Sequence, residues 1–288
     1  MKKLSRNEVM SIELSILKEF DRFCRTHNLT YFLSDGTLLG AIRHGGFIPW
    51  DDDIDVTMPR SDYEKLYRLV KDGARCAYPI ISYRDGSSIY QILKMVDPST
   101  TTYENFVGKK YPQSVWIDIF PIERIWVDDP ELKKVERKIN NLLLKRSLTL
   151  ADSSVGSSRA AKVAKRIGKL FTKNADVNKM NAEIDALASS ISSDRPNSGN
   201  SIAWSCFATM PGLKHPDDVV FPVSSVSFEG LEFLAPAKPE KYLEIQYGDW
   251  KALPPEDKRY VHFPDVFKKD DKEIVDETAR EKPMQKSC

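Results

Sequence analysis

Net charge is almost absent from this sequence. Its 43 Lys and Arg residues are balanced by 42 Asp and Glu residues, which leaves a formal charge of +1. Proteins that hold nucleic acid through its phosphates usually present a basic excess, so the balance predicts that nucleic acid is not a partner. The basic side chains are expected to lie among acidic ones on a mixed surface.

Long apolar runs are missing as well. No window reaches the roughly 18 consecutive apolar residues of a membrane span. Residues 1–17 contain two lysines but no apolar segment, because Glu8 and Glu13 interrupt it. We therefore expect no signal peptide and a cytoplasmic protein, at most peripheral to the inner face of the membrane.

Cysteine is scarce, and its spacing excludes a zinc finger. The four cysteines are Cys24, Cys76, Cys206 and Cys288, and no two lie at the short separations of zinc ligands. We expect reduced thiols that fill the core rather than catalyse. With 288 residues, of which 41% are hydrophobic and 30% charged, the chain suits one large domain or a core with an insertion.

Glycines and aspartates are concentrated in residues 32–56, FLSDGTLLGAIRHGGFIPWDDDIDV. This stretch holds Gly36, Gly40, Gly45, Gly46, Asp51, Asp52, Asp53 and Asp55. Glycines let backbone N–H groups approach an anion closely, whereas clustered carboxylates repel one another unless a cation lies among them. The stretch therefore predicts a phosphate site beside a divalent-metal site.

The alternation in Asp53-Ile54-Asp55-Val56 indicates a strand. In a strand, Asp53 and Asp55 would point to one face and the two apolar residues to the other. Two carboxylates on one face can share a hard cation such as Mg²⁺. An isolated pair of this kind is usually a solvated loop, so the prediction depends on the glycine-rich segment next to it.

Two sets of motifs resemble the LicD family. The first is Gly-Thr-Leu-Leu-Gly at 36–40, followed by Arg43, Gly46, Pro49-Trp50-Asp51-Asp52-Asp53 and Asp55. The second is Tyr-Gly-Asp-Trp at 247–250, followed by Pro254-Pro255, Arg259 and His262. LicD proteins are bacterial phosphocholine-transferase-like proteins related to the fukutin proteins of animals. The resemblance covers about residues 1–125 and 220–265. It implies a nucleotidyltransferase-type fold, of α+β class, in which helices flank a mixed sheet.

The same fold implies a third acid on a neighbouring strand. Asp118 lies in the run Trp116-Ile117-Asp118-Ile119-Phe120-Pro121, which is similar to a family motif. With Asp53 and Asp55 it would hold Mg²⁺ or Mn²⁺, and Asp118 or Asp51 would accept a proton from the attacking hydroxyl. The alternative for Asp118 is a structural ion pair within the strand.

Several residues are candidates for substrate binding. Gly36, Thr37, Arg43 and Lys94 are expected to contact phosphate, and Trp250, Arg259 and His262 complete the set. Arg43 has an alternative as the ion-pair partner of a nearby aspartate. Lys94 lies on an apolar strand face, where it would neutralise phosphate or an acid, or lie on an edge strand. Trp250 and Tyr247 would stack on a base or a choline group, or fill the core.

The implied reaction transfers a phospho-alcohol, such as phosphocholine, from a CDP-linked donor. The implied acceptor is a hydroxyl of a cell-surface glycan, a lipid-linked glycan or a teichoic-acid-type polymer. One alternative is a nucleotidyltransferase that moves NMP, which the same site would serve. Another is a non-catalytic binding module on the same fold.

The order of elements predicts an interrupted core. We expect a nucleotidyltransferase-like part at 1–128, a helical insertion at 129–200, the rest of the core at 201–267 and a polar, disordered tail at 268–288. Ser5 and Glu8 form a capping box for a helix over 5–27. Further helices are expected over 38–43, over 61–72 beginning at Ser61, and ending near Tyr247; strands are expected over 78–83, 88–96 and 115–121, and a hairpin over 226–233.

Residues 159–173 read as a basic amphipathic helix, with basic and apolar residues on opposite sides. Such a helix can lie on an anionic membrane surface or hold a polyanionic acceptor. The simpler interpretation is a solvated charged face.

Overall fold

The computed structural model describes most of the chain. The described residues are 1–51, 53–102, 113–126, 129–151, 168, 172, 175–191, 201–205, 213–256, 259 and 265–270. Asp52, His262, nearly all of the predicted basic helix and most of the C-terminal tail lie outside them.

The N-terminal helix α1, Arg6–His27, begins as its capping box predicts. The Ser5 side chain accepts a hydrogen bond from the Glu8 amide, and the Glu8 carboxylate accepts one from the Ser5 amide. The apolar positions of α1 turn towards the sheet and bury Ile16, Leu17 and Phe20 completely. Local sequence signals alone therefore define this helix, and packing on β5 and β6 adds its tertiary support.

Nine of the described strands form one mixed sheet. They are β1 (Lys2–Lys3), β2 (Phe32–Leu33), β3 (Asp55–Pro59), β4 (Ile80–Ile81), β5 (Leu93–Thr102), β6 (Gln113–Trp126), β7 (Ser201–Ser205), β8 (Leu213–Pro216) and β11 (Phe267–Lys268). The order across the sheet is β1-β11-β5-β6-β3-β2, with β4 on β5 and with β7 and β8 extending from the far half of β6. Only the β3–β6 pair among these is parallel. Helices and a mixed sheet confirm the predicted α+β class.

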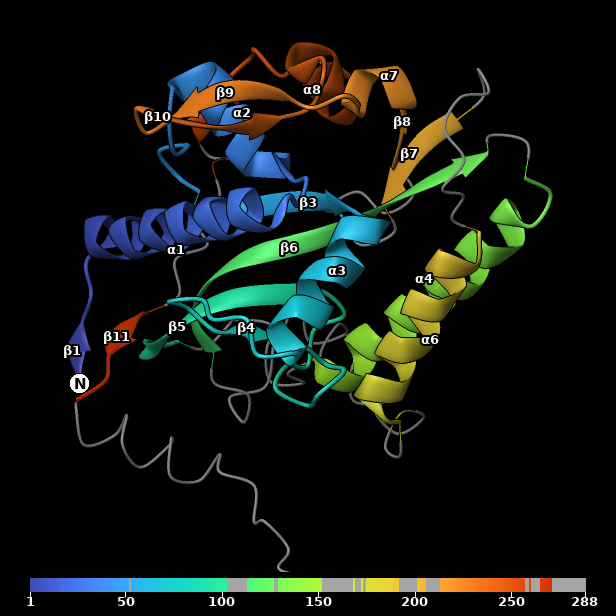
Figure 1. The fold of residues 1–288 in the computed structure, drawn as a ribbon, viewed down its shortest axis with the longest axis horizontal. Coiled ribbons are helices and arrows are strands. Elements are labelled where there is room, and N and C mark those ends of the chain that lie inside the picture. Colours follow the sequence, from blue (N-terminus) through green and yellow to red (C-terminus); the bar gives the residue numbers. More distant parts are fainter. Residues whose placement is uncertain are drawn as a thin grey trace, which may run out of the picture.

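Helix α2 (Asp35–His44), helix α8 (Pro239–Tyr247) and a second sheet lie together at one end of the molecule (Figure 1). The second sheet is the hairpin of β9 (Ser224–Phe228) and β10 (Leu231–Ala235), which confirms the predicted turn at Glu229-Gly230. The short helix α7 (Asp217–Val220) precedes it. Segments from both ends of the chain thus share one apolar core.

Several predicted boundaries were wrong. Helix α2 begins at Asp35, so Gly36 and Thr37 lie in its first turn rather than in a preceding loop. Helix α3 (Arg60–Lys71) begins one residue before Ser61, with Pro59 at the N-cap position. The strand predicted over 88–96 is β5, which begins at Leu93 and runs to Thr102, whereas residues 89–92 are bends.

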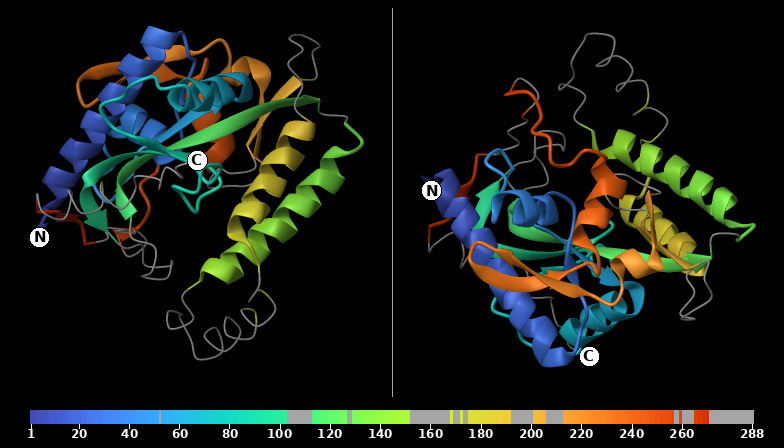
Figure 2. Two further views of the ribbon diagram at one scale, coloured as in Figure 1. Left: turned by 60° about the horizontal axis from the view of Figure 1, so that its bottom comes forward. Right: turned by 90° about the horizontal axis from the view of Figure 1, so that it is seen from above.

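A helical hairpin follows β6. Helices α4 (Leu132–Leu150) and α6 (Val177–Ser190) run side by side at one edge of the molecule in all views (Figures 1 and 2). Their apolar faces enclose Ile139 and Ile184 and pack on residues of the sheet, including Phe120 and Trp204. The hairpin therefore has its own apolar cluster, built partly from the strands that carry it.

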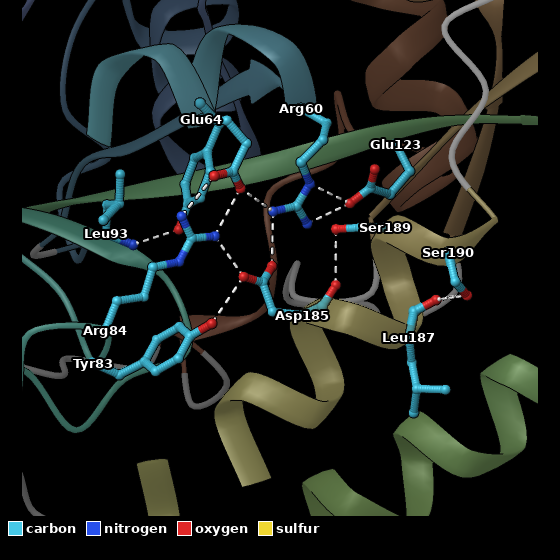
Figure 3. Close-up of polar contacts among 11 residues, drawn as sticks. Arg60, Glu64, Tyr83, Arg84, Leu93, Glu123, Asp185, Leu187, Ser189 and Ser190 are labelled. Carbon is cyan, nitrogen blue, oxygen red and sulfur yellow. Dashed lines mark hydrogen bonds and ion pairs between the residues drawn. The ribbon is translucent and has the colours of Figure 1, made fainter. Parts of the chain in front are cut away.

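A buried network of charges also joins the hairpin to the sheet (Figure 3). Arg60 at the start of α3 pairs with Glu123 of β6 and, at 2.7 Å, with Asp185 of α6. Arg84 pairs with Glu64 at 2.7 Å and also reaches Asp185. Through Asp185, the network thus links α6 directly to Arg60 of α3 and to Arg84.

Within the part of the chain that the structure describes, no helix is both long enough and apolar enough to cross a membrane.

Candidate metal-binding and catalytic site

The structure brings three aspartates together. Asp55 is the first residue of β3 and Asp118 lies in the middle of β6, directly opposite Asp55 in the parallel register. Asp53 precedes β3 by two residues. One carboxylate oxygen from each of the three lies within 4.8 Å of the other two. Asp53 is outside the strand as assigned, but the backbone between the two acids already pairs with β6, since the Ile54 carbonyl accepts from the Asp118 amide at 2.8 Å.

The electrostatics of this group favour a bound cation. Burial raises the pKa of the Asp55 carboxyl well above its usual value, and the charges of Asp53, Asp35, Asp118 and Asp51 raise it further. Converging carboxylate oxygens are the ligands that hard divalent cations prefer, and such a cation would remove the repulsion that these acids exert on one another. The residues present therefore fit a divalent metal ion.

Asp118 is held on both of its oxygens. The Lys94 ammonium lies 2.6 Å from Oδ1, and the Trp116 indole N–H donates to Oδ2 at 3.1 Å. Lys94 is only 2% exposed and lies on β5 between β4 and β6, so its interpretation as an edge-strand lysine was wrong. The two other predicted partners of Lys94 were phosphate and an acid, and in the structure Lys94 pairs with an acid, Asp118.

The first turn of α2 contacts the acids directly. A Cβ atom at Gly36 would lie 2.3 Å from Asp51 Oδ2, so only glycine lets that carboxylate approach the helix. The Thr37 hydroxyl accepts a hydrogen bond from the backbone N–H of Asp55 at 2.8 Å. These two residues, predicted to contact phosphate, thus also fix the positions of two acids.

Sequence reasoning missed Asp35. This residue is 2% exposed, has a left-handed backbone with φ of 47°, and accepts a hydrogen bond from Gln246 of α8 at 2.6 Å. Its charge raises the pKa values of Asp55, Tyr242 and Tyr247. The sequence Ser34-Asp35-Gly36 contains a signal for this backbone conformation, since aspartate tolerates a left-handed backbone before a helix. The prediction for this segment was based on Gly36 instead.

Arg43 lies at the far end of α2. Its guanidinium donates to the carbonyl oxygens of Trp250 at 2.9 Å and Ala252 at 3.4 Å. The charge of Asp51 also acts on this guanidinium, so the pairing of Arg43 with a nearby aspartate stays a prediction. Partial burial lowers its pKa, and its contacts tie α2 to the turn that follows α8.

Next to this turn is a surface pocket of about 450 Å³. Its lining is largely aromatic and aliphatic, with Trp50, Tyr247 and Trp250 among its walls. Trp250 is 8% exposed and belongs to the core. The Arg259 guanidinium lies 4.7 Å from the centre of the Trp50 ring, whereas His262, the remaining predicted site residue, lies outside the described residues.

Most of the chain is similar to a known protein. Residues 28–129 match the model described as "LicD/FKTN/FKRP, nucleotidyltransferase domain". The chain is also 28% identical over 271 residues to the lipopolysaccharide cholinephosphotransferase LicD of Haemophilus influenzae, a match that covers 91% of this chain and 97% of that protein. The similarity to LicD proteins thus comprises a family-type domain at 28–129 and a match at 28% identity over most of the chain.

Other relatives match only part of the chain. The uncharacterized protein RP689 of Rickettsia prowazekii is 25% identical over 149 residues, which cover 49% of this chain and 55% of that protein. Mannosyltransferase regulator 4 of Saccharomyces cerevisiae is 29% identical over 105 residues, which cover 36% of this chain and 8% of that protein.

The family match at 28–129 includes α2, β3, β5 and the whole of β6, and therefore all three converging aspartates and Lys94. The match to the Haemophilus protein extends further than the motifs indicated. It leaves only 9% of this chain uncovered, which is far less than the segment 129–200. The expectation that the LicD resemblance stops at the helical hairpin was therefore wrong.

Proposed function

We propose that this protein is a phosphotransferase that moves a phospho-alcohol group onto a hydroxyl of a cell-surface glycan. The observation that carries the proposal is the convergence of Asp53, Asp55 and Asp118 within a LicD-type domain. The relative from Haemophilus influenzae, by its name, transfers phosphocholine to lipopolysaccharide. Phosphocholine is thus the first candidate for the group transferred, and CDP-choline for its donor.

Asp53, Asp55 and Asp118 would hold Mg²⁺ or Mn²⁺. A divalent cation at such a site neutralises donor phosphate and stabilises the charge that develops in phosphoryl transfer, an effect of several kcal/mol. The chain supplies the remaining recognition of phosphate. The backbone N–H groups in the first turn of α2 are unpaired within the helix and carry its positive dipole end, so donor phosphate would lie over Gly36 and Thr37.

In the proposed step, the acceptor hydroxyl oxygen bonds to the phosphorus that bears the alcohol. The bond from that phosphorus to the oxygen of CMP breaks, CMP leaves, and the hydroxyl proton passes to a carboxylate. The Asp118 carboxylate is already engaged by the Lys94 ammonium in an ion pair and by the Trp116 indole N–H in a hydrogen bond. We therefore favour Asp51, which lies over the first turn of α2, as the proton acceptor.

The pocket beside Trp50 is the candidate site for the organic head group. Quaternary ammonium groups favour aromatic faces, and the rings of Trp50, Tyr247 and Trp250 line this pocket. Asp51 follows Trp50 directly, and its charge contributes to the raised pKa of Tyr247. A donor with its phosphates at the acids would thus have its alcohol within reach of these rings.

For the acceptor we propose a chemical class, a glycan or a lipid-linked glycan. We keep the proposed division into a catalytic core at 1–128 and 201–267, a helical insertion at 129–200 and a polar tail from 268. Lys268 lies in β11 and pairs with Thr100 of β5, so the tail begins no earlier than the end of β11. Contact of 159–173 with a membrane or a polyanionic acceptor, and a cytoplasmic site of action, also remain proposals.

The test is a panel of CDP-alcohols, incubated with the protein and Mg²⁺ or Mn²⁺ and analysed by mass spectrometry. Release of CMP with one alcohol, abolished by a chelator, supports the proposal. Pyrophosphate release from a nucleoside triphosphate would instead favour NMP transfer. Neither product, together with no binding of metal, would indicate a non-catalytic binding module.

A further inference from the structure

Three charged residues lie in one row across three strands. Lys94 of β5 is directly opposite Asp118 of β6, and Asp118 is directly opposite Asp55 of β3. Residues opposite one another on neighbouring strands project to the same face of a sheet. The row therefore reads cation, anion, anion, and it ends at the candidate metal site.

Lys94 is fixed between two aromatic rings. Its ammonium lies 4.2 Å from the centre of the Tyr90 ring and 4.1 Å from the centre of the Trp116 ring. It is 2% exposed, and it meets Asp118 Oδ1 at 2.6 Å. A lysine on the surface has many rotamers, whereas this one is confined by packing, cation–π contact and an ion pair.

Trp116 acts on both members of the pair. Its ring faces the Lys94 ammonium while its indole N–H donates to the other oxygen of Asp118, at 3.1 Å. One oxygen of Asp118 meets the Lys94 ammonium in an ion pair and the other accepts from the Trp116 indole, so the carboxylate cannot rotate without breaking one of these contacts. Its remaining lone pairs are thereby held in one direction.

The helical hairpin holds the other ring. Arg146 of α4 lies 5.7 Å from the centre of the Tyr90 ring, on which Lys94 also lies. Arg146 donates to the Ile89 carbonyl at 2.9 Å and to Asn181 of α6 at 2.8 Å. The segment just before β5, which includes Tyr90, is thus anchored to α4 and α6. This anchoring places the Tyr90 ring against Lys94.

We propose that Lys94 is a positioning residue, which fixes the Asp118 carboxylate for a divalent cation held with Asp53 and Asp55. This inference depends on the proposed metal site and adds a role for Lys94 other than phosphate contact. It differs from a second role, that of a simple counter-charge. A counter-charge repels a divalent cation, so its removal strengthens metal binding, whereas loss of a positioning residue weakens it.

The test is direct binding of Mn²⁺ to the full-length protein without substrate, measured by electron paramagnetic resonance and calorimetry. Lys94→Met keeps the apolar stem between the rings and removes the ammonium. We expect it to bind Mn²⁺ about tenfold more weakly, as for other residues that orient a metal ligand. Lys71→Met is the matched control, because Lys71 also lies over a tyrosine ring, Tyr67 at 5.9 Å, but has no contact with the acids; we expect it to leave binding unchanged.

Equal or tighter Mn²⁺ binding by Lys94→Met would overturn the proposal in favour of the counter-charge. If that variant fails to fold, Tyr90→Leu decides, since it removes one ring but keeps the lysine and its charge. We expect Tyr90→Leu to weaken Mn²⁺ binding severalfold, and unchanged binding would overturn the proposal. Absence of Mn²⁺ binding by the unaltered protein would refute the metal site itself, which distinguishes the two failures.

Kinetics separate positioning from phosphate contact. With CDP-choline as the donor at saturating Mn²⁺, a positioning role predicts that Lys94→Met lowers kcat and leaves the donor KM unchanged. A direct phosphate contact predicts a raised donor KM, and that result would also overturn the proposal.

Discussion

Asp55→Asn provides the sharpest test of the acidic cluster, because it should make the protein more stable and less active at once. Asparagine has almost the same shape, and the backbone N–H that donates to Thr37 is retained. What changes is one charge in a buried position where burial and four neighbouring acids already raise the pKa of the carboxyl.

The magnitudes follow from the geometry. Two carboxylate charges no more than 4.8 Å apart repel by at least roughly 3 kcal/mol at an effective dielectric constant of about 20. The Lys94 ammonium beside Asp118 offsets part of this repulsion, so we expect metal-free Asp55→Asn to gain about 1 kcal/mol of unfolding free energy. That corresponds to a rise in Tm of about 2–4 °C for a protein of this size class. Activity should fall by about a thousandfold, because a metal ligand with several kcal/mol of transition-state stabilisation is weakened.

The assay compares metal-free Tm with CMP release at saturating Mg²⁺. Asp72→Asn is the matched control, since Asp72 is exposed at the end of α3, and it should change neither quantity. Near-normal turnover by Asp55→Asn would refute the assignment of this residue to the metal site. A large loss of metal-free stability, absent from the control, would show that Asp55 is a structural partner rather than one of a repelling group.

Three further predictions concern charge, pH and recognition. Asp118→Ala should destabilise the metal-free protein by about 3 kcal/mol, because the buried Lys94 ammonium loses its partner, and chemical denaturation should show that adding Lys94→Met recovers part of the loss; full stability of Asp118→Ala alone would contradict the ion pair. Burial lowers the pKa of His215 to about 4. Below about pH 6.5, His215 therefore binds a proton in the unfolded chain but stays neutral in the folded protein. Stability should therefore fall by about 2 kcal/mol between pH 7 and pH 5 on account of this residue, and His215→Phe, which keeps the stacking on Tyr242, should remove that part of the slope in urea titrations at the two pH values. Trp50→Ala should raise the KM for CDP-choline about tenfold, if the ring contributes a desolvated cation–π contact, without altering Mn²⁺ affinity; an unchanged KM would exclude the pocket as the head-group site.

Local signals in the sequence predicted much of the fold. The capping box of α1 and the hairpin around Glu229-Gly230 depend on short-range patterns, and the structure confirms both. The α+β class, which the family resemblance implied, is confirmed as well. Boundaries next to the site were less predictable. Asp35 adopts a left-handed backbone and is the first residue of α2, whereas this helix was expected to begin at Leu38. Tertiary contacts with Gln246 and the acids override the local preference here.

The pairing of distant residues could not be predicted from local patterns. Asp118 was expected near the other acids only through the family resemblance, since the sequence contains no information on which strands are neighbours. Lys94 was recognised as unusual because it interrupts an apolar face, but its partner follows from the register of β5 on β6. Asp35 has no periodic pattern around it, and its role depends on α8, more than 200 residues later in the chain.

The row of charges across β5, β6 and β3 also constrains how the sheet can assemble. Lys94 has isoleucines on either side of its partner, Ile117 and Ile119, and both are fully buried. A shift of one residue between β5 and β6 would turn Lys94 to the opposite face and remove its anion. Such a misaligned sheet would contain a buried ammonium without a partner and would be strongly disfavoured. The residues proposed to bind the metal would thus also reject incorrect strand alignments before any metal or substrate is present.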